Sequence, residues 1–305
     1  MSIAPEIVTR FAPSPNGRLH LGHAFSALMG QYLAGEGRFL LRIEDIDLGR
    51  RRDNFVTAIY DDLAWLGLSW EQPAMLQSSR FDIYRAALDR LIKMQVVYPC
   101  WATRKEILDV IQAKGSRADW PADPDGAPIY PGIYRDISPA RRNELMWENT
   151  SYAWRLDTSR ALAAIEKKGI KTITYHEKST GETVLVTPQV FGDVVIARKD
   201  VPTSYHLSVV VDDAAQNVNL VTRGMDLQAA THVHRILQIL LDLPEPDYYH
   251  HPLVRNPQGR RLSKRAGDSG FDLHRQQGMT AQQVIDMLPP PIGILSPPIG
   301  GSDQS

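Results

Sequence analysis

The sequence has only one cysteine, Cys100, among its 305 residues. A single thiol cannot close a disulfide within the chain or supply a multi-cysteine metal site, so a disulfide-stabilised fold is excluded and a cytoplasmic location is expected. No apolar run reaches the roughly 18 residues that a membrane-spanning helix needs, and the first residues lack the basic-then-apolar pattern of a signal peptide. We therefore expect no contact with a membrane.

A strong excess of charge is also missing, because 34 Lys and Arg residues face 35 Asp and Glu residues. A nucleic-acid partner would need a local basic patch, since the net charge of -1 provides no overall attraction. Hydrophobic residues make up 43% of the chain and charged residues 23%, which is the balance of a globular protein with a buried core. Disorder throughout the chain is excluded.

The first hundred residues alternate between strand and helix patterns. A β-prone run at 7–12 ends in turn-forming residues, a helix is expected over 21–36, and a second strand over 38–43. Two further helices are expected over 52–66 and 80–97. This alternation predicts an α/β fold with a doubly wound parallel sheet.

The pattern changes near Cys100. Short strands at 172–175 and 183–186 are expected to belong to a smaller subdomain, and an apolar strand at 206–211 followed by a helix at 228–241 returns to the doubly wound pattern. The expected division of the chain has five parts: 1–99, the first half of the doubly wound domain; 100–190, an inserted subdomain; 191–243, the second half; 244–288, a loop and stem-like region; and 289–305, a tail expected to be disordered.

The segment 10–23 reads RFAPSPNGRLHLGH, which predicts a strand, a rigid turn and the start of a helix. A helix N-terminus presents N–H groups to an anionic phosphate, and Gly22 lets a flat base or ribose approach the backbone. His20 and His23 can donate hydrogen bonds to phosphate oxygens. Taken alone, the same pair would also suit a metal ion or a simple helix cap.

A second segment, 259–265, reads GRRLSKR and follows turn-forming residues at 256–258. A lysine-bearing loop that closes on a triphosphate can stabilise the charge that develops at phosphorus. An isolated basic run is more often a solvated surface, so this segment indicates a function only in combination with segment 10–23.

Together the two segments resemble the signature motifs of class I aminoacyl-tRNA synthetases, in the expected order. The glutamyl branch of that family is the most similar. The resemblance rests on segment 10–23 and on further matches: RIEDID at 42–47, SYHL at 204–207, VVDD at 210–213 and VTRGMDL at 221–227. The resemblance covers residues 7–270. It implies a class I synthetase fold, which is a Rossmann-like doubly wound parallel sheet with an inserted α+β subdomain and a short helical C-terminal extension.

The resemblance also implies a ligase that activates glutamate with ATP as substrate and Mg²⁺. The implied catalytic residues are His20, His23 and Lys264. The implied ATP-binding set consists of the same three residues together with Gly22, Leu262 and Ser263.

For glutamate, the resemblance implies a binding set made of Arg10, Ala12, Ser14, Glu44, Tyr205 and Arg223. The chemistry of these residues agrees with a substrate that has two carboxylates and one ammonium group. Each arginine can hold a carboxylate through two hydrogen bonds, and Glu44 can hold the ammonium group. The Tyr205 hydroxyl can donate a hydrogen bond while its ring forms a wall of the pocket.

The position of the second signature suggests which members of the branch are the most similar. Full-length glutamyl-tRNA synthetases continue with a large anticodon-binding region, whereas Lys264 lies near the end of this sequence, and Val209 stands where they usually carry Asn. The resemblance therefore favours the stand-alone members, which attach glutamate to the queuosine base in the anticodon of tRNA(Asp). Two alternatives stay open: a minimal synthetase that charges the 3′ end of a tRNA, and a non-catalytic regulatory paralogue that binds glutamate or tRNA. No obligate protein partner is expected.

Stand-alone members often bind zinc through Cys-x-Cys and a later Tyr-x-x-x-Cys. The corresponding residues here are Cys100, Ala102, Tyr130 and Tyr134. Structural zinc sites nearly always use four strong ligands, so we expect no structural zinc and interpret Cys100 as a small buried hydrophobic residue.

Overall fold

The computed structural model describes residues 5–148, 151–198, 200–255 and 270–290. In chain order its elements are β1 (Val8–Phe11), α1 (Leu21–Ala34), β2 (Arg38–Ile43), α2 (Asp53–Trp65), β3 (Glu71–Leu76), η1 (Gln77–Arg80), α3 (Phe81–Lys93), β4 (Val97–Cys100), α4 (Arg104–Lys114), α5 (Pro139–Trp147), β5 (Ala153–Leu156), α6 (Thr158–Lys167), β6 (Thr174–Glu177), β7 (Glu182–Leu185), η2 (Pro188–Phe191), β8 (Val195–Arg198), α7 (Tyr205–Ala215), β9 (Leu220–Gly224), η3 (Met225–Leu227), α8 (Thr231–Leu240), β10 (Asp247–His251), α9 (Phe271–Gln276) and α10 (Ala281–Asp286).

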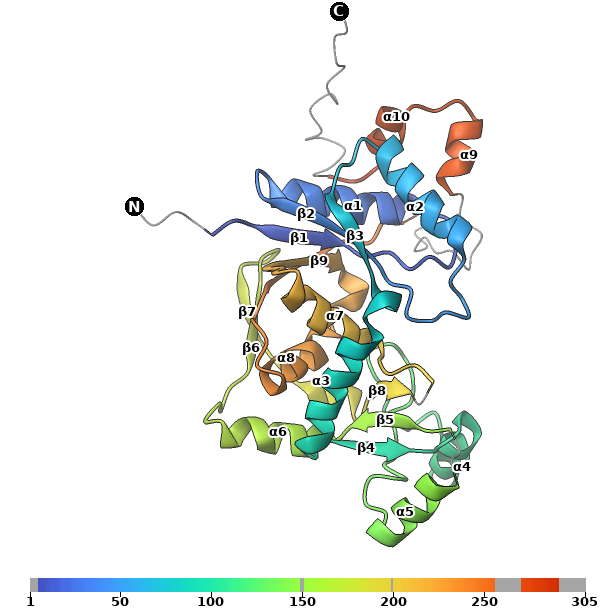
Figure 1. Cartoon of the computed structure of the whole chain (residues 1–305), viewed down its shortest axis with the longest axis vertical. Coiled ribbons are helices and arrows are strands. Elements are labelled where there is room, and N and C mark those ends of the chain that lie inside the picture. The colour runs from blue at the N-terminus through green and yellow to red at the C-terminus, as the bar shows by residue number, and fades with distance from the viewer. Residues whose placement is uncertain (1–4, 149–150, 199, 256–269, 291–305) are drawn as a thin grey trace, which may run out of the picture.

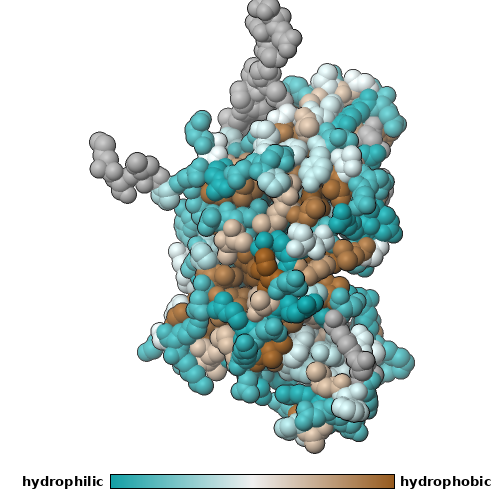
Figure 2. All heavy atoms as spheres, viewed as in Figure 1, coloured by the Kyte–Doolittle hydropathy of each residue, from teal (hydrophilic) through white to brown (hydrophobic). Residues whose placement is uncertain are grey.

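The arrangement of these elements is the predicted α/β fold (Figure 1). Strands β1, β2 and β3 form a parallel sheet that lies with α1 and α2 towards one end of the molecule. An antiparallel sheet of β4, β5 and β8 lies with α4 and α5 at the opposite end, and α7 and α8 lie between the two sheets. Apolar side chains gather near the middle of this face, and most of the rest of it is polar (Figure 2).

A third sheet continues from the β1 edge of the parallel sheet. Strands β9 and β10 run parallel, β6 joins β10 in parallel, and β7 closes the order as an antiparallel edge. At the junction with β1, the Val8 backbone N–H donates to Asn219 Oδ1 at 2.8 Å, and the Asn219 N–H donates to the Val8 carbonyl at 3.2 Å. Further along the two strands, Arg10 Nη1 on β1 donates to the Thr222 carbonyl of β9 at 3.0 Å. The strands therefore lie side by side towards their carboxyl ends, which is where doubly wound folds bind their ligands.

The segment expected to be a strand at 206–211 is helical. Helix α7 packs against α3, α8 and β8, and all of its residues from 207 to 213 are buried. A helix buried on every side has no polar face, so its sequence lacks the 3.6-residue period, and the valines at 209–211 favour a strand locally. Tertiary packing decides in favour of the helix, and the sequence prediction is wrong here.

Two other expectations differ in detail from the structure. The strands expected at 172–175 and 183–186 exist as β6 and β7. Strand β6 pairs with β10 and β7 pairs with β6, so both belong to the sheet of β9 and β10 and not to a smaller subdomain. The helix expected over 80–97 ends at Lys93, because Gln95 takes a left-handed φ of 58° and Val97 then begins β4.

The C-terminal helices α9 and α10 form the predicted short extension. Phe271 and Val284 are fully buried and join the core that includes Phe25 on α1 and Leu63 on α2. The expected tail lies outside the described residues from 291 onwards. In the described ranges, no helix is both long enough and apolar enough to cross a bilayer.

Candidate active site

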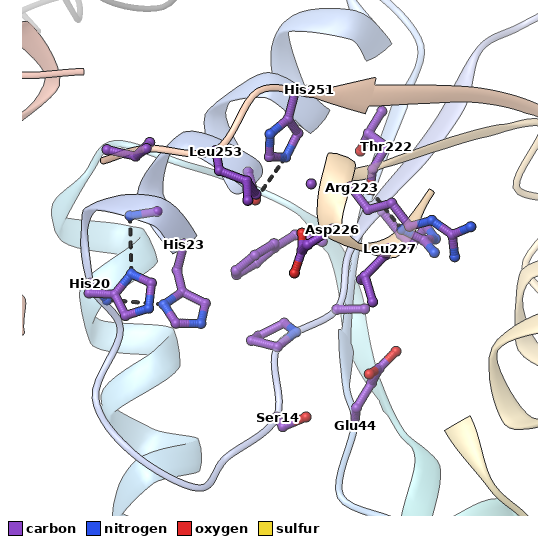
Figure 3. Close-up of a pocket in the computed structure, with 18 of the residues that line it drawn as sticks. Ser14, His20, His23, Glu44, Thr222, Arg223, Asp226, Leu227, His251 and Leu253 are labelled. Carbon is purple, nitrogen blue, oxygen red and sulfur yellow. Dashed lines mark hydrogen bonds between the residues drawn. The ribbon is translucent and has the colours of Figure 1, made fainter. Parts of the chain in front are cut away.

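A pocket of about 400 Å³ opens at the carboxyl ends of β1 and β9. It is lined by every described residue of the predicted site: Arg10, Ala12, Ser14, His20, Gly22, His23, Glu44, Tyr205 and Arg223. The predicted residues Leu262, Ser263 and Lys264 lie outside the described part of the chain. Figure 3 places the two histidines on one side of the pocket and Glu44 and Arg223 on the other, so its two ends differ in chemistry.

His20 and His23 are held by the start of α1. His20 is the N-cap, and its Nδ1 accepts the Gly22 N–H at 3.1 Å, while His23 Nδ1 accepts the His20 N–H at 3.1 Å. A ring nitrogen that accepts a hydrogen bond carries no proton, so both rings in this arrangement are neutral with their hydrogen on Nε2. Each imidazole can therefore donate its Nε2 hydrogen to a phosphate oxygen.

Gly22 lies close against the His20 ring. A Cβ at this position would lie 3.0 Å from His20 Cε1 and 3.1 Å from His20 Nδ1. Either the ring or the backbone would have to move, and the capping hydrogen bond would weaken. The glycine therefore keeps His20 in its capping position.

Arg10 is buried and already holds a protein carboxylate. Its Nε and Nη2 donate to the two oxygens of Asp213 at 2.9 and 3.3 Å, and its Nη1 donates to the Thr222 carbonyl at 3.0 Å. Asp213 also accepts a hydrogen bond from Arg42 Nη1 at 2.7 Å. Arg10 is therefore oriented inside the protein by a carboxylate that it shares with Arg42.

Glu44 lies at the same end of the pocket. Its Oε1 is 3.6 Å from Arg42 Nη2. Burial raises the pKa of Glu44 to about 7, against the opposing effects of Arg42 and Arg10. A carboxyl group balanced in this way gains its charge readily when an ammonium group binds beside it.

Arg223 projects from the end of β9 and is 5% exposed. Its Nη1 donates to the Tyr205 hydroxyl oxygen at 3.2 Å, which leaves the hydroxyl hydrogen of Tyr205 able to donate. Its other hydrogen bonds go to Thr231, His234 and His250, three residues outside the predicted site.

Several pocket residues were not predicted. Ser26 lies one turn after His23 on α1, and its Oγ is 2.9 Å from His251 Nε2. Asp226 lies within the VTRGMDL motif, but the motif indicated no role for it. No sequence pattern indicated His251, because the strand that places it, β10, was not predicted. The helical spacing from His23 was the one signal that could have indicated Ser26.

The residues at the zinc positions form a different structure. The Cys100 thiol donates to the Tyr130 hydroxyl oxygen at 3.3 Å, and that oxygen also accepts the Tyr134 N–H at 2.9 Å. One thiol and two phenols do not fit the thiolate and imidazole set of a structural zinc. Among the residues described, no three His, Cys, Asp or Glu side chains are grouped so that they could hold a metal ion.

Comparison with known proteins identifies the family. Residues 6–288 match the model described as tRNA synthetases class I (E and Q), catalytic domain. The chain belongs to this family. It is a class I aminoacyl-tRNA synthetase-like ligase, and the predicted resemblance is confirmed.

Two relatives of this family carry the name glutamyl-Q tRNA(Asp) synthetase. The protein of Rhodobacter capsulatus is 43% identical over 92% of this chain and 99% of its own length. The protein of Janthinobacterium sp. is 37% identical over 95% of this chain and 92% of its own length.

A solved structure of the same family has the same fold. The glutamate tRNA ligase from Elizabethkingia meningosepticum, in complex with its amino acid, superimposes with a TM-score of 0.75 at 25% identity. The match covers 95% of this chain, which spans only 61% of the length of that ligase.

Proposed function

We propose that this ligase activates glutamate with ATP to glutamyl-adenylate without a tRNA and then transfers the glutamyl group to the queuosine base in the anticodon of tRNA(Asp). The observation that carries the proposal is the similarity to two glutamyl-Q tRNA(Asp) synthetases over 99% and 92% of their own lengths. The composition of the pocket supports it, because the pocket offers groups for two carboxylates, an ammonium group and a phosphate.

In the first step, a carboxylate oxygen of glutamate attacks the α-phosphorus of ATP, and the bond from that phosphorus to pyrophosphate breaks. The product is glutamyl-adenylate. His20 and His23 would donate from Nε2 to phosphate oxygens, where charge develops in the transition state. Lys264 would act on the same charge, a role that comes from the resemblance alone.

Glutamate would be oriented at the opposite end of the pocket. Arg223 and Arg10 would face its carboxylates, Glu44 its ammonium group, and Tyr205 would donate from its hydroxyl. Mg²⁺ would accompany the triphosphate, because this ion usually binds substrate phosphates together with one or two carboxylates.

In the second step, a hydroxyl oxygen of queuosine attacks the acyl carbon. The bond from that carbon to the AMP oxygen breaks, the hydroxyl proton is lost, and a glutamyl ester remains on the base. Bases of single-stranded loops are readily splayed out towards a protein, so an anticodon loop is a suitable substrate for an open pocket.

The deciding experiment locates the glutamate on the tRNA. The protein is incubated with ATP, labelled glutamate and queuosine-containing tRNA(Asp), and the tRNA is then digested with nuclease. The label should lie in the anticodon fragment, and tRNA(Asp) without queuosine should stay unlabelled. Label on the 3′-terminal adenosine of tRNA(Glu) would instead support a minimal glutamyl-tRNA synthetase.

A second measurement separates an enzyme from a binding protein. Glutamate-dependent exchange between ATP and pyrophosphate should proceed without any tRNA. Exchange that needs tRNA would contradict the proposed order of steps. Binding of glutamate without exchange or transfer would support the regulatory alternative.

A further inference from the structure

Neutral hydrogen-bond acceptors surround the Arg223 guanidinium. Its Nε donates to His250 Nε2 at 3.1 Å, its Nη1 to His234 Nδ1 at 3.1 Å, and its Nη2 to Thr231 Oγ1 at 2.6 Å. With the Tyr205 hydroxyl, these are the hydrogen-bond partners of this guanidinium in the described part of the chain. Arg10 differs, because both oxygens of Asp213 hold it.

The donor character of arginine fixes the tautomer of each histidine. The ring nitrogen that faces Arg223 must carry a lone pair, so a neutral His250 has its hydrogen on Nδ1, where it donates to Glu177 Oε2. A neutral His234 has its hydrogen on Nε2, which lies 3.2 Å from His206 Nδ1. The two rings that flank one guanidinium are therefore opposite tautomers.

The surroundings keep both rings uncharged. His234 and His250 are 2% and 3% exposed, and burial together with the positive charge of Arg223 lowers the pKa of His234 well below its usual value. Burial also lowers the pKa of His250, against the hydrogen bond to Glu177. Burial alone would raise the pKa of Glu177, but the hydrogen bonds from His250 and Ser179 bring it to about 2. The charged Glu177 thus fixes the ring of His250 in one orientation.

The identity of the acceptors matters for binding. A carboxylate partner would orient a guanidinium but would also compensate its charge, whereas an imidazole lone pair orients it and leaves the charge in place. Arg10 is of the first kind and Arg223 of the second. In a pocket that must bind an anion, the second kind retains the larger attraction.

We propose that His234 and His250 are positioning residues that hold the Arg223 guanidinium through neutral lone pairs, so that its positive charge stays available to a carboxylate of the amino-acid substrate. The proposal rests on the proposed function for the identity of that substrate as glutamate. Glu177 has a supporting role, because it determines which nitrogen of His250 faces Arg223.

The kinetic test compares substitutions of His250 in the glutamate-dependent exchange of ATP and pyrophosphate. His250→Leu removes the acceptor, and the KM for glutamate should rise about 10- to 100-fold, the effect of losing one hydrogen bond to a charged group, with a smaller change in kcat. His250→Gln can place an amide oxygen near Arg223 and should recover most of the affinity. The KM for ATP should not change in either variant.

His232→Gln is a matched control. His232 lies on α8, two residues before His234, but its Nδ1 accepts the Thr187 backbone N–H and does not contact Arg223. This variant should keep the wild-type KM for glutamate. Variants of His250 that change the KM for ATP or kcat while the KM for glutamate stays constant would overturn the proposal.

Nitrogen-15 NMR of the histidine rings in the wild-type protein tests the arrangement without any variant or activity. His250 should be the Nδ1–H tautomer and His234 the Nε2–H tautomer, both neutral at pH 7. The same tautomer in both rings, or a charged ring, would overturn the proposal. If wild-type protein showed no exchange with glutamate, the proposed function would fail, whereas opposite tautomers would still support the positioning of Arg223.

Discussion

Arg42 and Asp213 form an ion pair that is closed off from solvent. Arg42 Nη1 lies 2.7 Å from Asp213 Oδ1, and the two side chains are 0% and 7% exposed. Asp213 on α7 also holds Arg10 on β1, so one carboxylate connects a helix to two strands of the sheet beneath the pocket. Burial of the two guanidinium groups therefore depends on the negative charge of Asp213.

Asp213→Ala should lower the free energy of unfolding by about 3–5 kcal/mol, because Arg10 and Arg42 would remain buried without the carboxylate that they share. Urea denaturation measures the effect. Asp109→Ala is the control, since Asp109 is exposed on α4 and pairs with Lys105 at the surface. It should leave stability nearly unchanged, and similar losses in both variants would refute the role of Asp213.

Lys264→Ala and Arg223→Ala should have different kinetic effects. The lysine is proposed to meet charge that appears only in the transition state, so its loss should reduce kcat of activation by roughly 10²- to 10³-fold. The arginine is proposed to bind ground-state glutamate, so its loss should mainly raise the KM for glutamate. Steady-state exchange kinetics distinguish the two, and identical profiles would contradict this division of roles.

Glutamate binding should weaken as the pH falls below neutrality. Burial raises the pKa of Glu44 to about 7, so the group is a carboxylate above that pH and a neutral acid below it. Only the carboxylate attracts the substrate ammonium group, and affinity should fall by up to about tenfold per pH unit below 7. Calorimetry from pH 5.5 to 8.5 measures the effect, and in Glu44→Gln the step near pH 7 should disappear while overall affinity is lower.

The purified protein should contain no stoichiometric zinc, because Cys100, Ala102, Tyr130 and Tyr134 do not form a tetrahedral ligand set. A zinc-selective chelator should leave the circular dichroism spectrum and the exchange activity unchanged, whereas removal of Mg²⁺ should stop exchange. One tightly bound zinc per chain in elemental analysis would show that this interpretation is wrong.

The sequence predicted the fold class because strand and helix patterns alternate clearly in the first hundred residues, and the predicted strand over 38–43 coincides with β2. It failed at α7, where burial on all sides removes the helical period. The described residues of the predicted site line one pocket because they occur in contiguous motifs. Residues that act through another residue, such as Glu177 and His250, come from strands without such motifs, and only the folded chain brings them to Arg223.

Cys100 gives this protein a chemical probe of its own local motions. It is the single thiol of the sequence, it is 3% exposed on β4, and it donates a hydrogen bond to the Tyr130 hydroxyl. An alkylating reagent reaches such a thiol during transient opening of the surrounding structure, so the ratio of its labelling rate to that of free cysteine gives the free energy of that opening. Any ligand that tightens this region can therefore be followed by the slowing of a single covalent reaction, without a label or an added cysteine.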